Sequence, residues 1–269
     1  MTTQIRRRAL ALFPFLVLLL AGCSGTSEHK TTGTFPVPPE IEPNVEFWRH
    51  VYGVWGRNKV AFHDDEYMGV IYEVSDVPGS GKNHFIKAKK AWYKSRLATL
   101  ERKVTRGESL TGSKRALHEK IVDAGGTRAL VGASEPVRAP RGIREKFRRV
   151  LEISGRYDDS FREIFRSRGL PEDLAYLPHV ESSFQVSARS SVGAAGIWQF
   201  MPATGRIYGL TVSHAVDDRL DPTIAAEGAA GYLGSAHGKL GSWPLAITSY
   251  NHGQGGMAKA KRIYGNDFG

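Results

Sequence analysis

Residues 171–202 read PEDLAYLPHVESSFQVSARSSVGAAGIWQFMP, and the start of this stretch predicts a helix with an acidic residue on its apolar face. Pro171 suits the first helical turn, and the two acidic residues after it favour the positive end of the helix dipole. Leu174, Leu177 and Glu181 follow at i, i+3 and i+7, so all three share one face. We therefore expect a helix from Pro171 that turns Glu181 toward the core.

The predicted position of Glu181 gives its carboxyl group the properties of a general acid. Burial on an apolar face and the negative end of a helix dipole both favour the protonated form, and so raise the pKa of a carboxyl group. A kink at Pro178 would weaken this periodicity. A structural glutamate bound to Arg189 or to backbone amides would show the same pattern, so the pattern alone leaves both interpretations open.

Further helix signals predict a mainly α-helical domain over residues 139–269. Amphipathic patterns predict helices at 143–153 and 158–167, the second ended by Gly169. We expect further helices to begin at about Gly193, Pro222 and Pro244, with a small hairpin contribution.

Residues 43–138 are predicted to form a small mixed α/β segment that precedes this domain. Within it, 45–77 predict a short helix and a hairpin, and 82–104 predict a basic helix whose lysines face solvent. Glycines and prolines between 125 and 140 place the boundary near Arg138. The stretch 45–77 is rich in aromatic residues, which favours packing against the rest of the chain over sugar binding, and both interpretations stay open. These aromatic residues are Phe47, Trp48, Tyr52, Trp55, Phe62, Tyr67 and Tyr72.

The first 42 residues predict export. Three arginines, 6–8, precede an apolar run, 9–20, which has the length of a secretory signal and is too short to span a bilayer as a helix. The run ends in Leu20-Ala21-Gly22-Cys23, which resembles the lipobox of bacterial lipoproteins. That resemblance implies a signal peptide over 1–22, lipidation of Cys23 and, because Ser24 follows, an outer-membrane lipoprotein facing the periplasm. The Ser-, Thr-, Gly- and Pro-rich residues 23–42 are expected to form a tether.

The charge of the chain is basic but diffuse. The net charge is +10, and loss of the three arginines at 6–8 would leave 34 basic and 27 acidic residues, a net charge of +7. A diffuse positive excess favours an anionic polymer or a membrane surface as neighbour. Because no compact Lys/Arg run with interleaved aromatic residues is present, nucleic acid is not expected as a partner.

Three ordered blocks carry a resemblance to a known family. They are Glu181-Ser182-Ser183-Phe184, the run ARSSVGAAGIWQFMP at 188–202, and Ser249-Tyr250-Asn251-His252-Gly253. Together they resemble the lytic transglycosylases with an SLT domain, in the goose-type lysozyme superfamily, over residues 144–269. The resemblance implies a lysozyme-like α+β fold over 139–269. Relatives usually extend beyond the last helix, so the domain is expected to be C-terminally incomplete.

The resemblance also implies the site residues. Glu181 matches the catalytic acid/base, and the motif positions that line the cleft are Ser190, Gln199, Met201, Tyr250 and Asn251. The amide of Gln199 can bind sugar hydroxyl or acetamido groups. The hydroxyl of Tyr250 could orient the carboxyl of Glu181, and a core tyrosine is the alternative. Many relatives read Gly-Leu-Met-Gln where this chain has Gly196-Ile197-Trp198-Gln199, which alters the cleft wall.

The reaction implied by the family needs one carboxyl group. Ordinary glycosidases use two carboxylates, but the nearest acidic cluster, Asp217, Asp218 and Asp221, is assigned here to helix initiation before Pro222. The resemblance implies cleavage of the N-acetylmuramic acid–N-acetylglucosamine bond of peptidoglycan glycan strands, with 1,6-anhydromuramoyl ends. It implies no metal and no cofactor. Two alternatives remain: a hydrolytic muramidase and a non-catalytic wall-binding lipoprotein.

Overall fold

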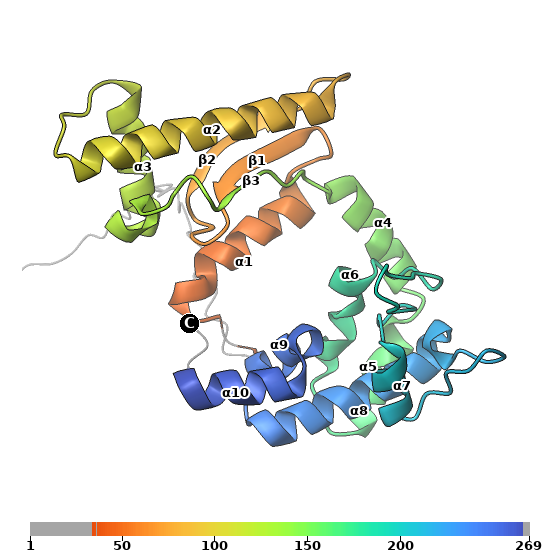
Figure 1. Cartoon of the computed structure of the whole chain (residues 1–269). Helices are drawn as coiled ribbons and strands as arrows, with labels where there is room; N and C mark the ends of the chain where they lie inside the picture. Colours follow the sequence, from red (N-terminus) through yellow and green to blue (C-terminus); the bar gives the residue numbers. More distant parts are fainter. Residues whose placement is uncertain (1–33, 36, 266–269) are drawn as a thin grey trace, which may run out of the picture. The chain divides into compact units, whose positions relative to one another are not determined.

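The computed structural model describes residues 34–35 and 37–265 (Figure 1). The predicted signal peptide and the lipidation site Cys23 lie outside the described residues, as does most of the predicted tether. Within the described part of the chain, no helix is long and apolar enough to cross a membrane.

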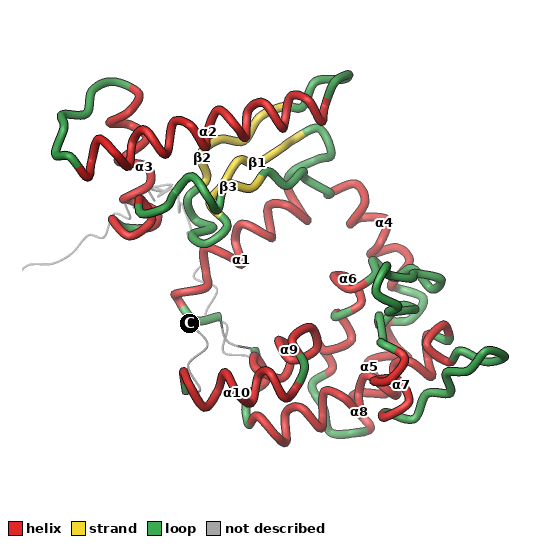
Figure 2. The backbone as a smooth tube through the Cα atoms, viewed as in Figure 1, coloured by secondary structure: helices red, strands yellow, loops and turns green. Residues whose placement is uncertain are grey.

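The amino-terminal part combines a short sheet with helices, as its sequence predicts. A 3-10 turn, Pro39–Ile41, leads into helix α1, Glu42–Arg49, which continues as a π-helical turn, His50–Val54. Strands β1, Lys59–Asp64, and β2, Ile71–Asp76, form an antiparallel hairpin with Lys59 opposite Asp76. The short strand β3, Val137–Arg138, pairs antiparallel with the other edge of β1 (Figure 2).

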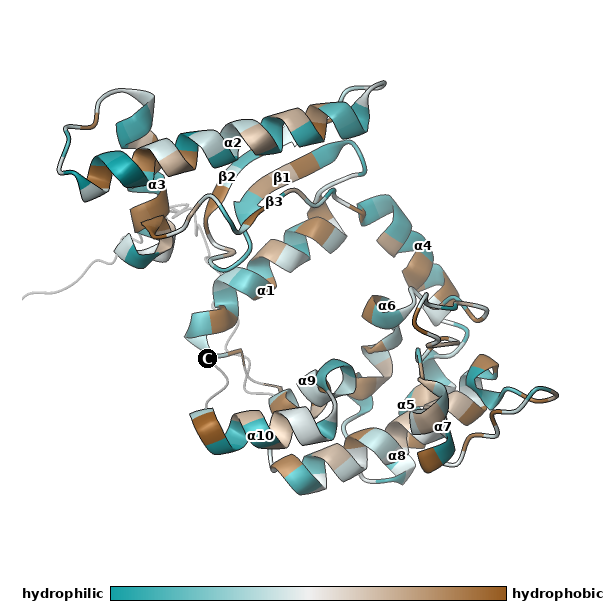
Figure 3. Ribbon diagram, in the orientation of Figure 1, coloured by the Kyte–Doolittle hydropathy of each residue, from teal (hydrophilic) through white to brown (hydrophobic). Residues whose placement is uncertain are grey.

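Two helices complete this part of the molecule. Helix α2, Lys82–Thr105, runs along the sheet and turns Tyr93, Leu97 and Leu100 into a core shared with β1 and β2 (Figure 1). Hydrophilic and hydrophobic residues alternate along α2 (Figure 3). Lys82 and Lys87 are exposed as expected, whereas Lys89 is half-buried and binds Glu73. Helix α3, Ser113–Gly125, which was not expected from the sequence, and a 3-10 turn at Thr127–Leu130 cover the same core.

The carboxy-terminal part is almost entirely helical. Helices α4, Arg144–Ser154, and α5, Asp158–Ser167, agree with the sequence prediction, and Gly169 follows α5 with a φ of 67°. Helix α8, Pro222–Leu240, is rich in buried small residues and packs against α5, α9, Trp243–His252, and α10, Gln254–Tyr264. Close packing around α8 produces a core that includes Phe161, Phe165 and Trp198.

Two helix predictions differ from the structure. The helix expected from Pro171 to Glu181 is divided into a 3-10 helix, Glu172–Tyr176, and a single turn, α6, Pro178–Glu181, because Pro178 interrupts the hydrogen-bond ladder. The helix expected at about Gly193 is wrong. Residues 189–200 form turns and isolated bridges, and the next helix is α7, Pro202–Ile207, with proline at its first position.

The carboxylate of Asp221 caps α8 and provides a stability test. Its Oδ1 accepts hydrogen bonds from the amides of Thr223 and Ile224, both at 2.9 Å. We expect Asp221→Ala to lower the free energy of unfolding by about 1 kcal/mol, and Asp221→Ser to restore most of it. Urea unfolding measures both variants. Equal stability of wild type and Asp221→Ala would contradict a capping role, and Asp123→Ala, an exposed change on α3, serves as control.

Candidate active site

Glu181 ends the single-turn helix α6, and the chain then turns sharply. The following residues Ser183 and Phe184 have positive φ values of 53° and 55°, which non-glycine residues rarely adopt. Phe184 is buried and stacks on Phe161 and Tyr157, at ring distances of 6.1 Å in both cases. Because this packing holds the strained turn in place, the backbone after Glu181 has a defined conformation.

The carboxyl group of Glu181 is half-buried and has one polar partner among the described residues. The side-chain amide of Asn251 donates to Oε1 of Glu181 at 3.1 Å. Burial raises the pKa of Glu181 above its ordinary value, and the hydrogen bond from Asn251 partly opposes this rise. The alternative of a structural pair with Arg189 does not hold, because the Arg189 guanidinium lies 3.4 Å from Asp217 instead. A raised pKa suits a general acid.

The loop 189–200 lies against α6 and is fixed by hydrogen bonds to its backbone. The Ser182 hydroxyl, directly after Glu181, is buried and donates to the carbonyl of Ile197 at 2.8 Å. Ser190 accepts a hydrogen bond from the Ala194 amide at 2.9 Å. Gln199 has a φ of 50°, and its amide group donates to the Gly196 carbonyl at 2.8 Å. The loop is therefore a defined wall beside Glu181.

Four of the five predicted cleft residues come together around one cavity. A cavity of about 420 Å³ is lined by residues of the loop and of α7, α8 and α9, among them Gln199, Met201, Tyr250 and Asn251. Met201 exposes 41% of its surface, which suits contact with a ligand. Neither Ser190 nor Glu181 lines this cavity. The Ser190 hydroxyl binds the loop itself, and Glu181 contacts the lining residue Asn251.

Two roles were expected for Tyr250 from the sequence: a hydroxyl that orients Glu181, or a core tyrosine. Its hydroxyl donates to the carbonyl of Trp198 at 2.8 Å, so the bond expected to Glu181 goes to the loop. Its ring packs edge-on against Phe200 and Tyr232. Burial, with the nearby negative charge of Glu181, raises the pKa of Tyr250 well above its ordinary value. Tyr250 thus joins α9 to the loop and keeps its proton at neutral pH.

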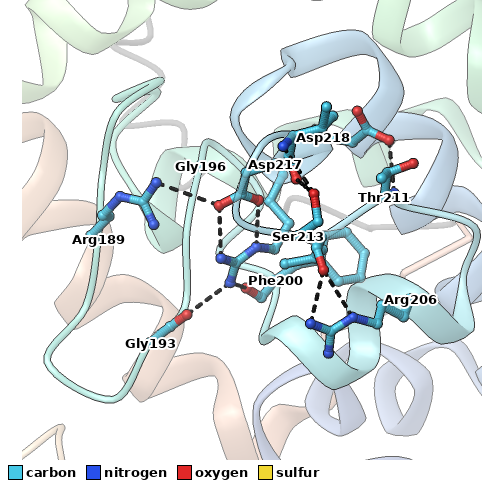
Figure 4. Close-up of polar contacts among 12 residues, drawn as sticks. Arg189, Gly193, Gly196, Phe200, Arg206, Thr211, Ser213, Asp217 and Asp218 are labelled. Carbon is cyan, nitrogen blue, oxygen red and sulfur yellow. Dashed lines mark hydrogen bonds and ion pairs between the residues drawn. The ribbon is translucent and has the colours of Figure 1, made fainter.

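A buried arginine behind the loop was missed by the sequence analysis. Arg219 is 4% exposed, and its Nη1 donates to the carbonyls of Gly193 and Phe200 at 2.8 and 3.0 Å. Its Nε and Nη2 bind the two carboxylate oxygens of Asp217, both at 2.8 Å (Figure 4). We call Arg219 and Asp217 the loop clamp. The only signal in the sequence is an arginine close to two aspartates, which is too common to identify such a pair.

The acidic cluster is therefore only partly a helix-initiation signal. Asp221 caps α8 as expected, but Asp217 binds Arg219, and Asp218 accepts a hydrogen bond from the Thr211 amide at 2.7 Å (Figure 4). The guanidinium of Arg219 holds the pKa of Asp217 below its ordinary value. All three carboxylates are thus engaged in local structure.

Gly196 allows the backbone of the loop to lie directly against the backbone of Arg219, a member of the loop clamp. Its φ is 79°, and a Cβ atom at this position would lie 1.7 Å from the carbonyl oxygen of Arg219. Any larger residue would force the two backbones apart. Gly196 is therefore required for the close approach of these two chain segments.

The described residues contain no cluster of three or more His, Cys, Asp or Glu side chains that could hold a metal ion. The polar groups around Glu181 are amides and hydroxyls, which suit hydrogen bonding to an uncharged polar ligand.

Comparison with known proteins assigns a family to this part of the chain. Residues 161–267 match the Transglycosylase SLT domain family. The matched segment runs from within α5 through the end of α10 and includes Glu181 and the five predicted cleft residues. The carboxy-terminal part of the chain therefore carries a transglycosylase SLT domain.

Individual relatives match the same region. Membrane-bound lytic murein transglycosylase D of Escherichia coli strain K12 is 41% identical over 97 residues, which cover 35% of this chain and 21% of that protein. Membrane-bound lytic murein transglycosylase F 2 of Alkalilimnicola ehrlichii is 33% identical over 129 residues, 45% of this chain and 27% of that protein. Peptidoglycan transglycosylase gp16 of Escherichia phage T7 is 36% identical over 102 residues, 37% of this chain and 8% of that protein. The chain thus matches only a minor part of each relative.

The loop clamp makes a testable contribution to stability. Arg219→Ala would leave two carbonyl groups without their donor and Asp217 with only the 3.4 Å contact to Arg189, and we expect it to lower the free energy of unfolding by about 3 kcal/mol. Asp217→Asn should remove the acid sensitivity of the pair. Because the folded-state pKa of Asp217 is lowered, its stabilising effect is present above the ordinary aspartate pKa and is lost as pH falls through the lowered value.

Urea unfolding of wild type and both variants between pH 2 and 7 measures these effects. This range includes the ordinary pKa of an aspartate, about 4. The difference between wild type and Asp217→Asn should shrink at the acid end of this range. A difference that stays constant with pH would contradict the ionic character of the clamp.

Proposed function

We propose that this chain is a lytic transglycosylase, which cleaves the β-1,4 bond between N-acetylmuramic acid and N-acetylglucosamine in peptidoglycan and leaves 1,6-anhydromuramoyl ends. The observation that carries the proposal is Glu181: a half-buried carboxyl group with a raised pKa, bound by Asn251, within a transglycosylase SLT domain. The names of the matched relatives, which include lytic murein and peptidoglycan transglycosylases, support this substrate class.

The proposed reaction uses Glu181 first as acid and then as base. The protonated carboxyl donates its proton to the glycosidic oxygen, and the bond from that oxygen to C1 of the muramic acid breaks. The acetamido group of the substrate stabilises the positive centre at C1. The C6 hydroxyl of the same sugar then attacks C1 and returns its proton to Glu181. Atoms and protons balance without the addition of water.

The surroundings of Glu181 support this reaction over hydrolysis by a carboxylate pair. Inverting and retaining glycosidases both require a second carboxylate near the first. The nearby candidates named in the sequence analysis are engaged elsewhere: Asp217 binds Arg219, Asp218 binds the Thr211 amide, and Asp221 caps α8. A single carboxyl group that alternates between acid and base fits this arrangement.

The proposal extends to the location of the enzyme. We infer a signal peptide over 1–22, lipidation of Cys23, a tether over 23–42 and a position on the outer membrane facing the periplasm. The support is the lipobox-like segment Leu20-Ala21-Gly22-Cys23, together with the words "membrane-bound" in the names of two relatives. Each buried CH₂ of an acyl chain contributes about 0.8 kcal/mol, so several chains on one cysteine provide a stable anchor.

Glu181→Gln tests the catalytic assignment. The amide keeps the size of the side chain but cannot donate a carboxylic proton, so we expect cleavage of purified peptidoglycan to fall by about 10²–10⁴-fold, the usual contribution of a general acid. Mass spectrometry of the released muropeptides should show wild-type products lighter by one water than products with reducing ends.

Each alternative predicts a different result in this experiment. Reducing ends would indicate a hydrolytic muramidase, and binding to peptidoglycan without cleavage would indicate a wall-binding lipoprotein. Cleavage by Glu181→Gln at the wild-type rate would rule out this residue as the catalyst. Glu163→Gln, an exposed change on α5, is a matched control.

Asn251→Ala tests the hydrogen bond to Glu181. The Asn251 amide stabilises the charged carboxylate and so lowers the pKa of Glu181, which means that its removal should raise this pKa. Because the first step needs protonated Glu181, activity falls as pH rises through its pKa. The alkaline limb of the pH–rate profile should therefore move to higher pH in the variant. A shift to lower pH, or an unchanged profile, would contradict this role.

A further inference from the structure

A second cavity is lined in part by Val180, the residue directly before Glu181. Its volume is about 1170 Å³, which is ample for a bound ligand. We call it the aromatic groove and define it by its six principal apolar lining residues: Trp48, Tyr52, Phe147, Leu151, Tyr176 and Val180. They come from α1 and its π-helical continuation, from α4, and from the segment that leads to Glu181.

Several of these side chains are large, apolar and exposed. Trp48 exposes 40% of its surface, Tyr176 46%, Leu151 49% and Val180 60%, whereas the neighbouring Phe47 is 2% exposed. The aromatic residues of the amino-terminal part thus divide into a buried set and an exposed set. Packing, favoured from the sequence, accounts for the buried set only. Apolar side chains that gather at the surface commonly mark a binding site.

The rings of the groove are held in a fixed row. The centroids of Trp48 and Tyr52 are 6.0 Å apart, and those of Tyr52 and Phe147 are 5.2 Å apart. On the other wall, the Arg162 guanidinium binds the Tyr176 hydroxyl and lies 4.8 Å from the centre of its ring. Hydrogen bonds from the Ile143 amide to the Val51 carbonyl and from the Arg144 side chain to the Val54 carbonyl join the π-helical turn to the start of α4. The ring of Phe147 lies 5.8 Å from that of His179, which belongs to α6 on the other wall. The surface is therefore preorganised.

The groove is continuous with the candidate active site along the chain. Val180 lines the groove, and the next residue is Glu181, whose carboxyl binds Asn251. Consecutive Cα atoms are about 3.8 Å apart, so the backbone at the edge of the groove directly adjoins that of Glu181.

We propose that the aromatic groove is an extended binding site for the peptidoglycan glycan strand, outside the units that react; this inference rests on the proposed function. The C–H faces of pyranose rings pack on aromatic side chains, and exposed Trp48 and Tyr176 offer such faces. Asn44 and Arg49 also line the groove and can bind acetamido oxygens and carboxylates. A groove with two walls fits a narrow polymer better than a flat lipid surface.

The proposed binding site gives a role to residues that lie outside the matched domain. Trp48 and Tyr52 precede residue 161, where the family match begins. In this arrangement α1 contributes to the length of strand that the enzyme holds and leaves the chemistry to the SLT domain.

The test measures binding in the full chain with Glu181→Gln, so that cleavage does not interfere. The probes are long peptide-free glycan strands, obtained by amidase treatment of peptidoglycan, and a disaccharide of N-acetylglucosamine and N-acetylmuramic acid. Addition of Trp48→Ala should weaken binding of long strands about tenfold, which corresponds to about 1.4 kcal/mol, and leave binding of the disaccharide unchanged. Trp48→Phe keeps a ring and should retain most of the affinity.

The matched control is Trp92→Ala, an exposed tryptophan on α2 that does not line the groove. Equal affinities of the Trp48→Ala and control proteins for long strands would overturn the proposal, as would an equal loss for the disaccharide. Binding of anionic phospholipid vesicles, but not of glycan, that depends on Trp48 would overturn it in favour of a membrane contact. Thermal unfolding checks that each variant is folded.

This experiment separates the groove from the proposed function. A wild-type chain that binds long strands through Trp48 but does not cleave them would contradict the proposed activity and leave the groove intact. If the chain cleaves peptidoglycan normally and Trp48→Ala leaves strand binding unchanged, the groove proposal is contradicted and the proposed activity stands.

Discussion

The hydrogen bonds that fix the loop 189–200 are the constraint on which the rest of the candidate site depends. Glu181 stands on a single helical turn, which cannot hold a side chain in position by itself. The loop beside it is bound from three directions: by Ser182 after α6, by Tyr250 on α9, and by Arg219 behind it. Each of these side chains reaches a backbone carbonyl of the loop, so the cleft wall is formed by main-chain contacts and depends little on the side chains that face the ligand.

The same arrangement lets Glu181 remain half-buried without an ionic partner. A carboxylate that loses hydration becomes harder to ionise, and a nearby guanidinium would reverse this effect. The buried guanidinium of this region is occupied by Asp217, and Arg189 also lies beside Asp217. Both guanidinium groups thus bind Asp217 and not Glu181, whose side-chain partner among the described residues is Asn251. The structure therefore keeps the charge of the loop clamp separate from the acid that the proposed reaction needs.

Local sequence signals predicted several regular elements, missed the helices α3, α7 and α10, and failed at the site loop. The helices α4, α5, α8 and α9 and the β1–β2 hairpin lie where periodicity, proline and capping signals placed them, because these signals act within a few residues. The helix expected at Gly193 does not form. Gly193, Gly196 and Gln199 all have positive φ values there, and the hydrogen bonds that stabilise this conformation come from residues distant in sequence.

The sequence by itself determined the helical class of the carboxy-terminal part and the family resemblance, and it supplied the prediction that Glu181 is the catalytic residue, because periodicity and ordered motifs are local properties of the chain. Only the tertiary structure decided which groups surround Glu181. Asn251 lies 70 positions away from it, Arg219 reaches Gly193 across 26 positions, and Trp48 and Val180 line one groove from separate helices. Burial and partner choice depend on such distant contacts, and they set the pKa of the carboxyl group and the surface offered to a ligand.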